Sequence, residues 1–279
     1  MRDSRELAGA WSRFQSHGFA PAADDLAGLV ARYWWARWDL RGEPGYRQLI
    51  VPQPSVQLTF PTDGPPMVRG VSRGRVRRTL SGLGAVFGVT FRPGVFRRFL
   101  DTPVDALTDR ALPAATVFGP DLPPLDPAPP TRTAEARNPA PGGGDATERA
   151  VAVMVADFER FLRARMPPGD PVGDEVAGWV ADIAATPALR RVDQLAERYG
   201  TGARRLQRLF AEHVGVSPKW VIRRYRLHEV TERMAARAPG ATIDWAGLAA
   251  ELGYADQAHL VRDFTNMFGE PPTSYAARY

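Results

Sequence analysis

The chain has 279 residues, a formal net charge of +5 and no cysteine. The lack of cysteine excludes disulfides, thiolate metal sites and a cysteine nucleophile. No run of about 18 apolar residues occurs, as a membrane-spanning helix would require, and no apolar signal core follows residues 1–6, so we expect a cytoplasmic protein.

Residues 1–119 are expected to form a β-rich domain. Strand-forming residues dominate 33–40, polar and apolar residues alternate over 55–60, and a further strand pattern covers 85–91. Glycine and proline separate these segments at turn-like spacing. Short helices are expected over about 23–32 and 94–100. These patterns predict a small sheet or partial barrel.

The middle of the chain divides into a linker and a helical connector. Residues 120–145 contain eight prolines and three glycines, which predicts an unstructured linker. Residues 146–186 carry two apolar stripes at helical spacing: Val151, Met154, Val155, Phe158 and Leu162, then Val176, Trp179, Val180 and Ile183. Either both stripes pack into the protein's own core, or one of them supports a homodimer.

Residues 187–279 contain an internal repeat. Leu195, Ala196, Gly200, Leu206, Arg208, Phe210, Gly215 and Pro218 recur as Leu248, Ala249, Gly253, Leu260, Arg262, Phe264, Gly269 and Pro272. The offset is 53 residues up to and including the first glycine pair, Gly200 and Gly253, and 54 residues after it. Eight identities in register indicate a duplicated structural unit.

Each copy is consistent with a helix-turn-helix. The glycine suits a left-handed residue that ends the first helix, and the apolar residues after it mark the buried face of a second helix. Asp256 and Thr201 are expected to cap the second helices, and Ser217 with Pro218 begins a long helix to about residue 236. The exposed faces of the second helices then carry Arg204, Arg205, Gln207 and Arg208 in the first copy, and Gln257, Ala258, His259, Val261 and Arg262 in the second.

Those side chains suit the recognition of double-stranded DNA. Arginine can bond guanine with two hydrogen bonds, glutamine can do the same to adenine, and Val261 can contact a thymine methyl group. The alternative for the polar residues is a solvated helix face, and for His259 a packing or capping role. On the connecting helix, at least one of Arg223, Arg224 and Arg226 is expected to pair with an acid such as Glu229 or Glu232, and none is assigned to phosphate.

The combination resembles the AraC/XylS family of bacterial transcriptional regulators over about residues 188–276. Residues 206–210, 214–219, 253–264 and 268–275 carry the resemblance. It implies two units joined by a long helix, each with its second helix in the major groove. Base contacts would then fall on Arg204, Gln207, Arg208, Gln257, Ala258, His259, Val261 and Arg262. The chain departs from the family pattern at Gly202 and Ala258, where serine is usual.

The N-terminal region resembles, through residues 51–55 and 87–94, a poorly characterised β-rich domain found on some family members. By analogy, that domain senses a small molecule or mediates dimerisation. Six aromatic residues are either core or the lining of a pocket for an apolar or planar ligand: Trp34, Trp35, Trp38, Tyr46, Phe60 and Phe91. The run of Arg69, Arg73, Arg75, Arg77 and Arg78 is either a solvated strand edge or a site for an anionic effector or DNA.

An enzyme is not expected. Residues 1–186 hold one histidine, His17, which excludes a site with two histidine ligands there, and neither a phosphate loop nor a nucleophile elbow occurs. No metal or other cofactor is expected. We predict an α+β protein: a sensor-like domain (1–119), a linker (120–145), a helical connector (146–186) and an all-α DNA-binding domain (187–279).

The predicted function is effector-modulated transcription regulation. The expected partners are double-stranded DNA and a small-molecule effector, with RNA polymerase and a second copy of the chain as further candidates, and no membrane. The alternative is a constitutive DNA-binding regulator whose N-terminal domain is a protein-interaction module without a ligand pocket.

Overall fold

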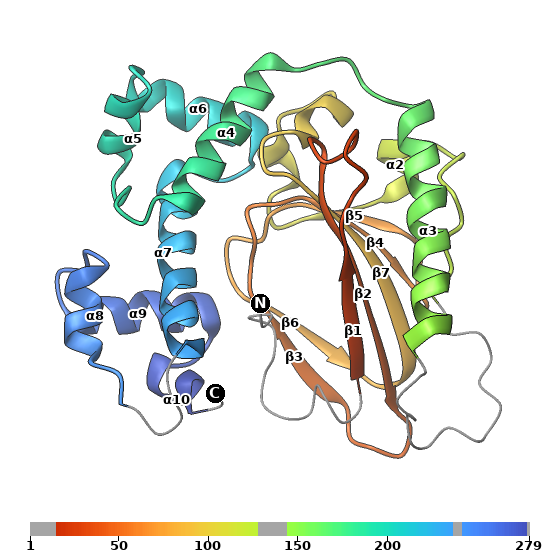
Figure 1. Ribbon diagram of the computed structural model, residues 1–279, viewed down its shortest axis with the longest axis horizontal. Helices are drawn as coiled ribbons and strands as arrows, with labels where there is room; N and C mark the ends of the chain where they lie inside the picture. The colour runs from red at the N-terminus through yellow and green to blue at the C-terminus, as the bar shows by residue number, and fades with distance from the viewer. Residues whose placement is uncertain (1–14, 128–143, 237–241, 278–279) are drawn as a thin grey trace.

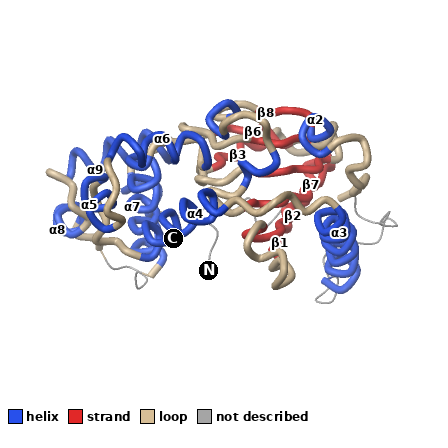
Figure 2. The backbone as a smooth tube through the Cα atoms, turned by 90° about the horizontal axis from the view of Figure 1, so that it is seen from above, coloured by secondary structure: helices blue, strands red, loops and turns tan. Residues whose placement is uncertain are grey.

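The computed structural model describes residues 15–127, 144–236 and 242–277. It has a sheet-containing body and a helical body, which lie side by side in both ribbon views (Figures 1 and 2). Most of the predicted linker, residues 128–143, lies outside the described residues. No helix in the described part of the chain is long and apolar enough to cross a membrane.

The first body is built on a six-stranded sheet in the order β1-β2-β7-β4-β5-β8, with every neighbouring pair antiparallel. Its strands are β1 (Gln15–Ala20), β2 (Val30–Leu40), β4 (Gln57–Pro61), β5 (Met67–Arg69), β7 (Gly82–Phe91) and β8 (Ala111–Pro113). A separate two-stranded ribbon pairs β3 (Tyr46–Ile50) with β6 (Val76–Leu80). The predicted strands are confirmed as β2, β4 and β7.

One face of the large sheet is covered by the helix α3 (Gly144–Ala164) (Figure 1). Tyr33 and Phe60 pack there against Phe158 of α3, and Phe87 packs against Tyr33 and Phe60, with ring centroids about 6 Å apart in each pair. The short helices α2 (Ala114–Phe118), η1 (Phe96–Phe99) and η2 (Val104–Leu107) complete this core. The helix predicted over 94–100 is therefore a short 3₁₀ turn.

The other face carries tryptophans that lie over glycines. The β2–β7 register pairs Trp34 with Gly88 and Trp38 with Gly84. A Cβ added at Gly88 would lie 2.1 Å from the Trp34 ring, and one at Gly84 would lie 2.2 Å from the Trp38 ring. Because each indole occupies the space of the missing side chain, glycine is required at both positions.

The helix predicted over 23–32 is wrong. Residues 24–29 form turns, in which the Leu26 and Leu29 amides bond the Ala23 and Leu26 carbonyls at 2.9 Å, and Val30 already begins β2. Leu26 and Leu29 of this segment are buried in the sheet core. Pairing of β2 with β7 thus overrides the local pattern.

The helical body begins with α4 (Pro171–Ala185) and contains α5 (Val192–Arg198), α6 (Ala203–His213), α7 (Pro218–Ala235), α8 (Trp245–Glu251), α9 (Gln257–Phe268) and α10 (Pro272–Ala276). It has two hydrophobic cores, one around α5 and α6 and one around α8 and α9. The central helix α7 belongs to both cores, since Val221 and Ile222 lie in the first and Leu227 and Val230 in the second.

The segment predicted as a connector consists of two helices that join different cores. The stripe of α3 packs on the large sheet, whereas the stripe of α4 packs with α5 and α6. The interpretation that both stripes belong to the protein's own core is therefore confirmed for these residues. Of the nine stripe residues, Val155 is half-buried and the other eight are buried.

Candidate nucleic-acid interface

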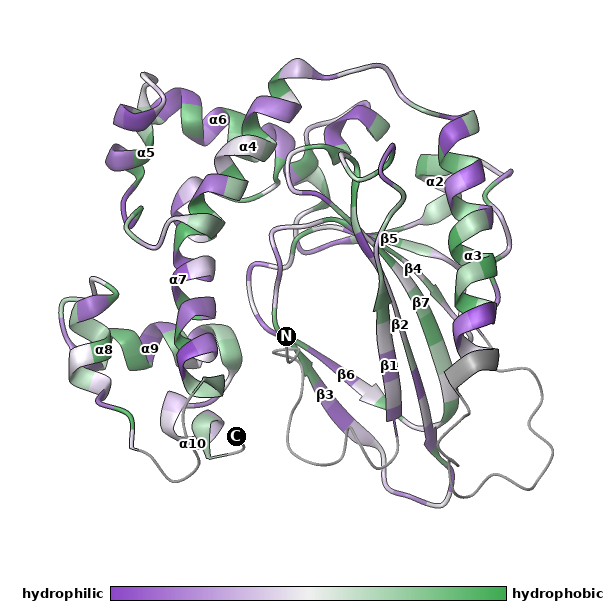
Figure 3. Ribbon diagram, in the orientation of Figure 1, coloured by the Kyte–Doolittle hydropathy of each residue, from purple (hydrophilic) through white to green (hydrophobic). Residues whose placement is uncertain are grey.

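In the first unit, α5 and α6 are joined by Gly200, whose φ of +57° lies in the left-handed region. Leu206, Leu209 and Phe210 of α6 are buried. The four predicted DNA-binding residues of this helix, Arg204, Arg205, Gln207 and Arg208, are all exposed. Figure 3 shows the hydrophilic character of α6. The helix therefore offers a cationic face with two hydrogen-bonding residue types.

The start of α6 differs from the prediction. Its N-cap is Gly202, which has no side chain to cap the helix, so the expected capping role of Thr201 is wrong. The glycine takes the extended backbone that an N-cap needs (φ −84°, ψ 148°). The first amides of α6 consequently lack a side-chain acceptor from the capping position.

In the second unit, α8 and α9 are joined by Gly253, with a φ of +73°. Asp256 caps α9 as predicted, because its side chain accepts from the His259 amide at 2.6 Å. Exposed on α9 are Gln257, Ala258 and Arg262, while His259 and Val261 are half-buried.

His259 is packed against its neighbours but remains partly exposed. Its ring lies edge-on to Tyr254, with centroids 5.2 Å apart, and its Nε2 is 3.9 Å from a carboxylate oxygen of Asp263. The side chain is nevertheless 44% exposed. Packing therefore orients a ring that DNA can still reach.

Few of the arginines exposed on α6 and α9 are paired with an acidic residue. Arg205 lies 3.9 Å from Glu175, which is too long for a hydrogen bond. Arg204, Arg208 and Arg262 form no ion pair with any residue in the described ranges. Their charges remain available to an anionic partner.

The arginines of α7 have partners other than those predicted. Arg223 lies 3.8 Å from Asp263, Arg226 donates to the Arg190 carbonyl at 2.6 Å, and Arg224 donates to the Pro52 carbonyl. The expected pairing of at least one of these arginines with an acid is met by Arg223 and Asp263. The two acids named as examples, Glu229 and Glu232, instead face Arg233 and His228. Arg224 is 1% exposed, and burial lowers its pKa to about 10.

The sheet-containing body contacts both units. Val71, after β5, lies in the core of the first unit, and Val51, after β3, lies in the core of the second. At the C-terminal ends of α6 and α9, Thr108 donates to the Gly215 carbonyl and Arg75 donates to the Thr265 carbonyl at 3.4 Å. Gly215 and Gly269, matched in the repeat, are the two left-handed residues at these contacts.

The six aromatic residues considered for a ligand pocket do not come together. Trp35, Phe60 and Phe91 belong to the core under α3. Trp34, Trp38 and Tyr46 form part of a smaller cluster on the opposite face of the sheet, with Leu80 of β6. Of the two groups, the second lies on the face of the large sheet that packs against side chains of the two-stranded β3–β6 ribbon.

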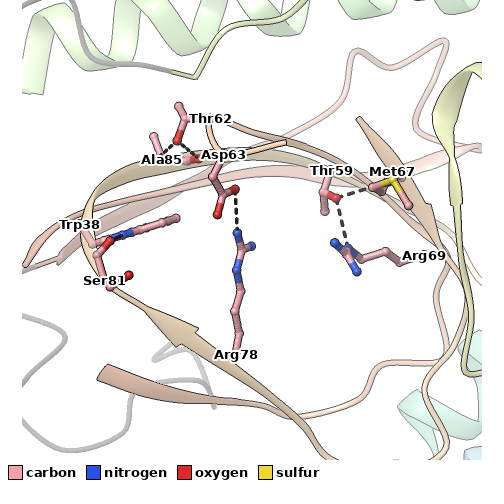
Figure 4. A network of polar contacts seen from close by, with 9 residues as sticks. All are labelled: Trp38, Thr59, Thr62, Asp63, Met67, Arg69, Arg78, Ser81 and Ala85. Atoms are coloured by element: carbon pink, nitrogen blue, oxygen red, sulfur yellow. Dashed lines mark hydrogen bonds and ion pairs between the residues drawn. The ribbon is translucent and has the colours of Figure 1, made fainter. Parts of the chain in front are cut away.

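Polar side chains lie on the same side of the sheet as Trp38 of that group (Figure 4). Arg69 donates to the Thr59 hydroxyl at 3.3 Å, and Arg78 donates to Asp63 at 3.3 Å while lying over the Trp38 ring at 5.6 Å. Burial, together with the charge of Arg78, lowers the pKa of Arg69. Of the predicted arginine run, Arg73 pairs instead with Asp109 at 2.6 Å. Among the described residues, no group of three or more potential metal ligands occurs.

Two family models match the chain. Residues 17–113 match a domain of unknown function (DUF6597), and residues 195–278 match a helix-turn-helix domain. No curated protein has a matching sequence.

The fold comparison finds ToxT from Vibrio cholerae. One ToxT crystal form has a TM-score of 0.39 at 10% identity and covers 95% of this chain and 97% of ToxT. ToxT from strain O395 bound to (E)-4-(8-methylnaphthalen-1-yl)but-3-enoic acid gives 0.39 at 10% identity, with 95% and 98% covered. ToxT from strain SCE256 with a bound unsaturated fatty acid gives 0.38 at 9%, with 97% and 96% covered.

The repeat, the two glycine turns and the match of residues 195–278 agree on one domain type. The chain carries an N-terminal DUF6597 domain and a C-terminal helix-turn-helix domain, and the second of these supports a role in DNA-binding transcription regulation.

Proposed function

We propose that the chain regulates transcription by placing α6 and α9 in two successive major grooves of one DNA duplex. The observation that carries the proposal is that α6 exposes all of its predicted base-contacting residues and α9 exposes Gln257, Ala258 and Arg262, while both helices bury their repeated apolar residues. Both helices pack on one rigid helix, α7, and lie beside its two ends (Figure 1).

The length of α7 suits this arrangement. It has 18 residues, which span about 27 Å at a rise of about 1.5 Å per residue. Successive major grooves on one side of B-DNA lie about 34 Å apart. A helix of this length can hold two reading helices near that separation.

Arg208→Ala tests the base-reading role. The variant should lose about 1–3 kcal/mol of binding free energy at the selected site and tolerate more bases at one position. The measurement is titration of the full chain with a selected duplex and with random duplex. An equal loss on both would show that Arg208 contacts phosphate only.

The N-terminal domain supplies an effector site on the sheet face that carries Trp34, Trp38 and Tyr46. Support comes from Arg78, whose guanidinium lies over the Trp38 ring, and from Arg69, which bonds Thr59 on the same side of the sheet (Figure 4). An aromatic ring and two cationic side chains suit a planar ligand with a negative charge. The contacts of the same domain with both units give a physical route to the DNA-binding helices.

A ligand changes DNA affinity only if it binds two protein states differently. The test screens aromatic carboxylates for a raised melting temperature of the wild type and of Arg78→Leu, and then titrates DNA with each hit. We expect a response that Arg78→Leu loses and that also alters DNA affinity. Stabilisation that survives Arg78→Leu would place the ligand elsewhere.

The second candidate is a constitutive regulator. It is favoured by one observation: two hollows, of about 400 and 380 Å³, are both lined by residues of the helix-turn-helix domain. In that case the DUF6597 domain acts through protein contacts. No ligand would then shift both the melting temperature and the DNA affinity.

A further inference from the structure

A cleft of about 400 Å³ separates the two helix-turn-helix units. Its walls come from the chain just before α5 and its first turn, from the first half of α7, and from α9. We call it the inter-unit cleft. Five of its ten lining residues are cationic, namely Arg190, Arg191, Lys219, Arg223 and Arg226.

The cationic charge in the inter-unit cleft exceeds what its acids neutralise. Asp193 pairs with Arg191 at 2.6 Å, and Asp263 is 3.8 Å from Arg223. Arg190 and Arg226 donate to the main-chain carbonyls of Glu251 and Arg190, which carry no net charge. Lys219 is exposed and has no ion pair with a residue in the described ranges.

Three arginines of the cleft also have spare donors. The Nε atoms of Arg190, Arg223 and Arg226 are buried and have no hydrogen-bond acceptor in the described part of the chain. A buried donor without an acceptor costs free energy, so such groups call for a partner. Arginine forks match phosphate oxygens in geometry and charge.

The position of the cleft identifies the source of the phosphate. Its wall includes His259 and Asp263 of α9, on the helix that exposes Gln257 and Arg262. A duplex whose successive major grooves receive α6 and α9 must turn the backbone between those grooves toward the gap between the units. The inter-unit cleft occupies that gap.

We propose that the inter-unit cleft binds the phosphodiester backbone of DNA between the two major grooves. Lys219 and Arg223 make the contacts, and Arg190 and Arg226 add positive potential from the sides. The inference rests on the proposed function, because it assumes that α6 and α9 read one duplex. Phosphate contacts of this kind position the protein and carry no base information.

The test compares wild type with Lys219→Ala, Arg223→Ala and the double variant, using the full chain. The matched control is Arg160→Ala, which removes one exposed charge from α3 on the sheet-containing body. Each protein is titrated with selected and random duplex over a range of chloride concentrations. Melting temperatures verify that every variant is folded.

Each single variant should reduce the slope of log affinity against log salt by about 0.9, and the double variant by about twice that. Affinities for selected and random duplex should fall by the same factor, while the control matches wild type. Unchanged slopes, or a loss confined to the selected duplex, would overturn the proposal. If wild type bound neither duplex, the proposed function itself would fail.

A final arm separates backbone phosphate from a free phosphate ligand. Wild type is titrated in sodium phosphate and in sodium chloride at matched ionic strength. Equal DNA affinities are expected in both salts. Extra inhibition by phosphate that Lys219→Ala abolishes would mean that the cleft holds free phosphate, which contradicts the backbone assignment.

Discussion

The first helix-turn-helix unit, on α5 and α6, exposes three arginines and a glutamine on its reading helix, whereas the second, on α8 and α9, exposes one glutamine and one arginine with a half-buried histidine and valine. The first helix starts without a side-chain cap, and the second is capped by Asp256. Yet the glycine turns and buried phenylalanines coincide. Packing and turn geometry are thus duplicated, while the reading faces have diverged.

The difference divides the binding work between the units. The first unit brings most of the positive charge, so it should supply most of the salt-dependent affinity. The second unit has a fixed, capped helix start and fewer cations, so its contribution depends more on base contacts than on charge.

The largest expected effects come from the matched phenylalanines in the two cores. Phe210 and Phe264 are both 0% exposed, and replacement of either by alanine should cost about 3–5 kcal/mol of unfolding free energy. Denaturant unfolding and DNA footprinting are the measurements. Because the two cores are separate, each variant should lose DNA protection mainly in the major groove that the mutated unit contacts. Equal loss in both grooves from either variant would contradict two independent units.

Arg224→Met should loosen the second unit's contact with the sheet-containing body. The variant removes a buried charge but leaves the Pro52 carbonyl without its donor, at a cost of about 1–3 kcal/mol. Amide exchange in residues 51–56 should therefore accelerate, whereas exchange around Val71, at the first unit, should not. Arg233→Met, on the exposed side of α7, is the control. Slow exchange at 51–56 in Arg224→Met would refute the docking role.

The difference in helix capping predicts two smaller effects on stability, of opposite sign. Asp256→Ala should destabilise the second unit by about 1 kcal/mol, and Gly202→Ser should stabilise the first by a few tenths of a kcal/mol, roughly the difference between these caps. Thermal unfolding measures both. Stabilisation by Asp256→Ala would mean that the 2.6 Å contact to the His259 amide does not hold the helix start.

The smallest effect concerns pH. Burial, and next the charge of Arg224, lower the pKa of His228 below its usual value of 6.5. The unfolded chain therefore binds this proton more readily, so His228 favours the folded state less as pH falls through about 6.5. His228→Gln should lose less melting temperature than wild type between about pH 7.5 and 5.5. An identical loss in both proteins would rule out His228 as a contributor.

The helical domain could be predicted in detail from the sequence because its signals are local and duplicated. Gly200, Gly253 and Asp256 each act within a few residues, and the structure gives them the expected conformations. Thr201 failed because Gly202, one position later, is the residue at the helix start. A single-residue shift of a cap lies below what a pattern can resolve.

In the N-terminal domain, local sequence patterns predicted the strands but not the contacts between distant parts of the chain. The strand-forming residues of β2 predicted a strand, but not that its odd-numbered and even-numbered aromatic residues would join different clusters on the two faces of the sheet. The partner of Arg224 lies 172 residues away at Pro52. No local pattern signals a contact of that separation, and the cleft between the units likewise exists only once α5, α7 and α9 are assembled.

Hydroxyl-radical footprinting of the full chain on a duplex selected from random sequence tests the central claim most directly. The account predicts two protected segments about one helical turn apart on one side of the duplex, with Arg208→Ala and Arg262→Ala each relaxing base preference in a different segment. A single protected segment, or both variants acting on the same bases, would contradict it.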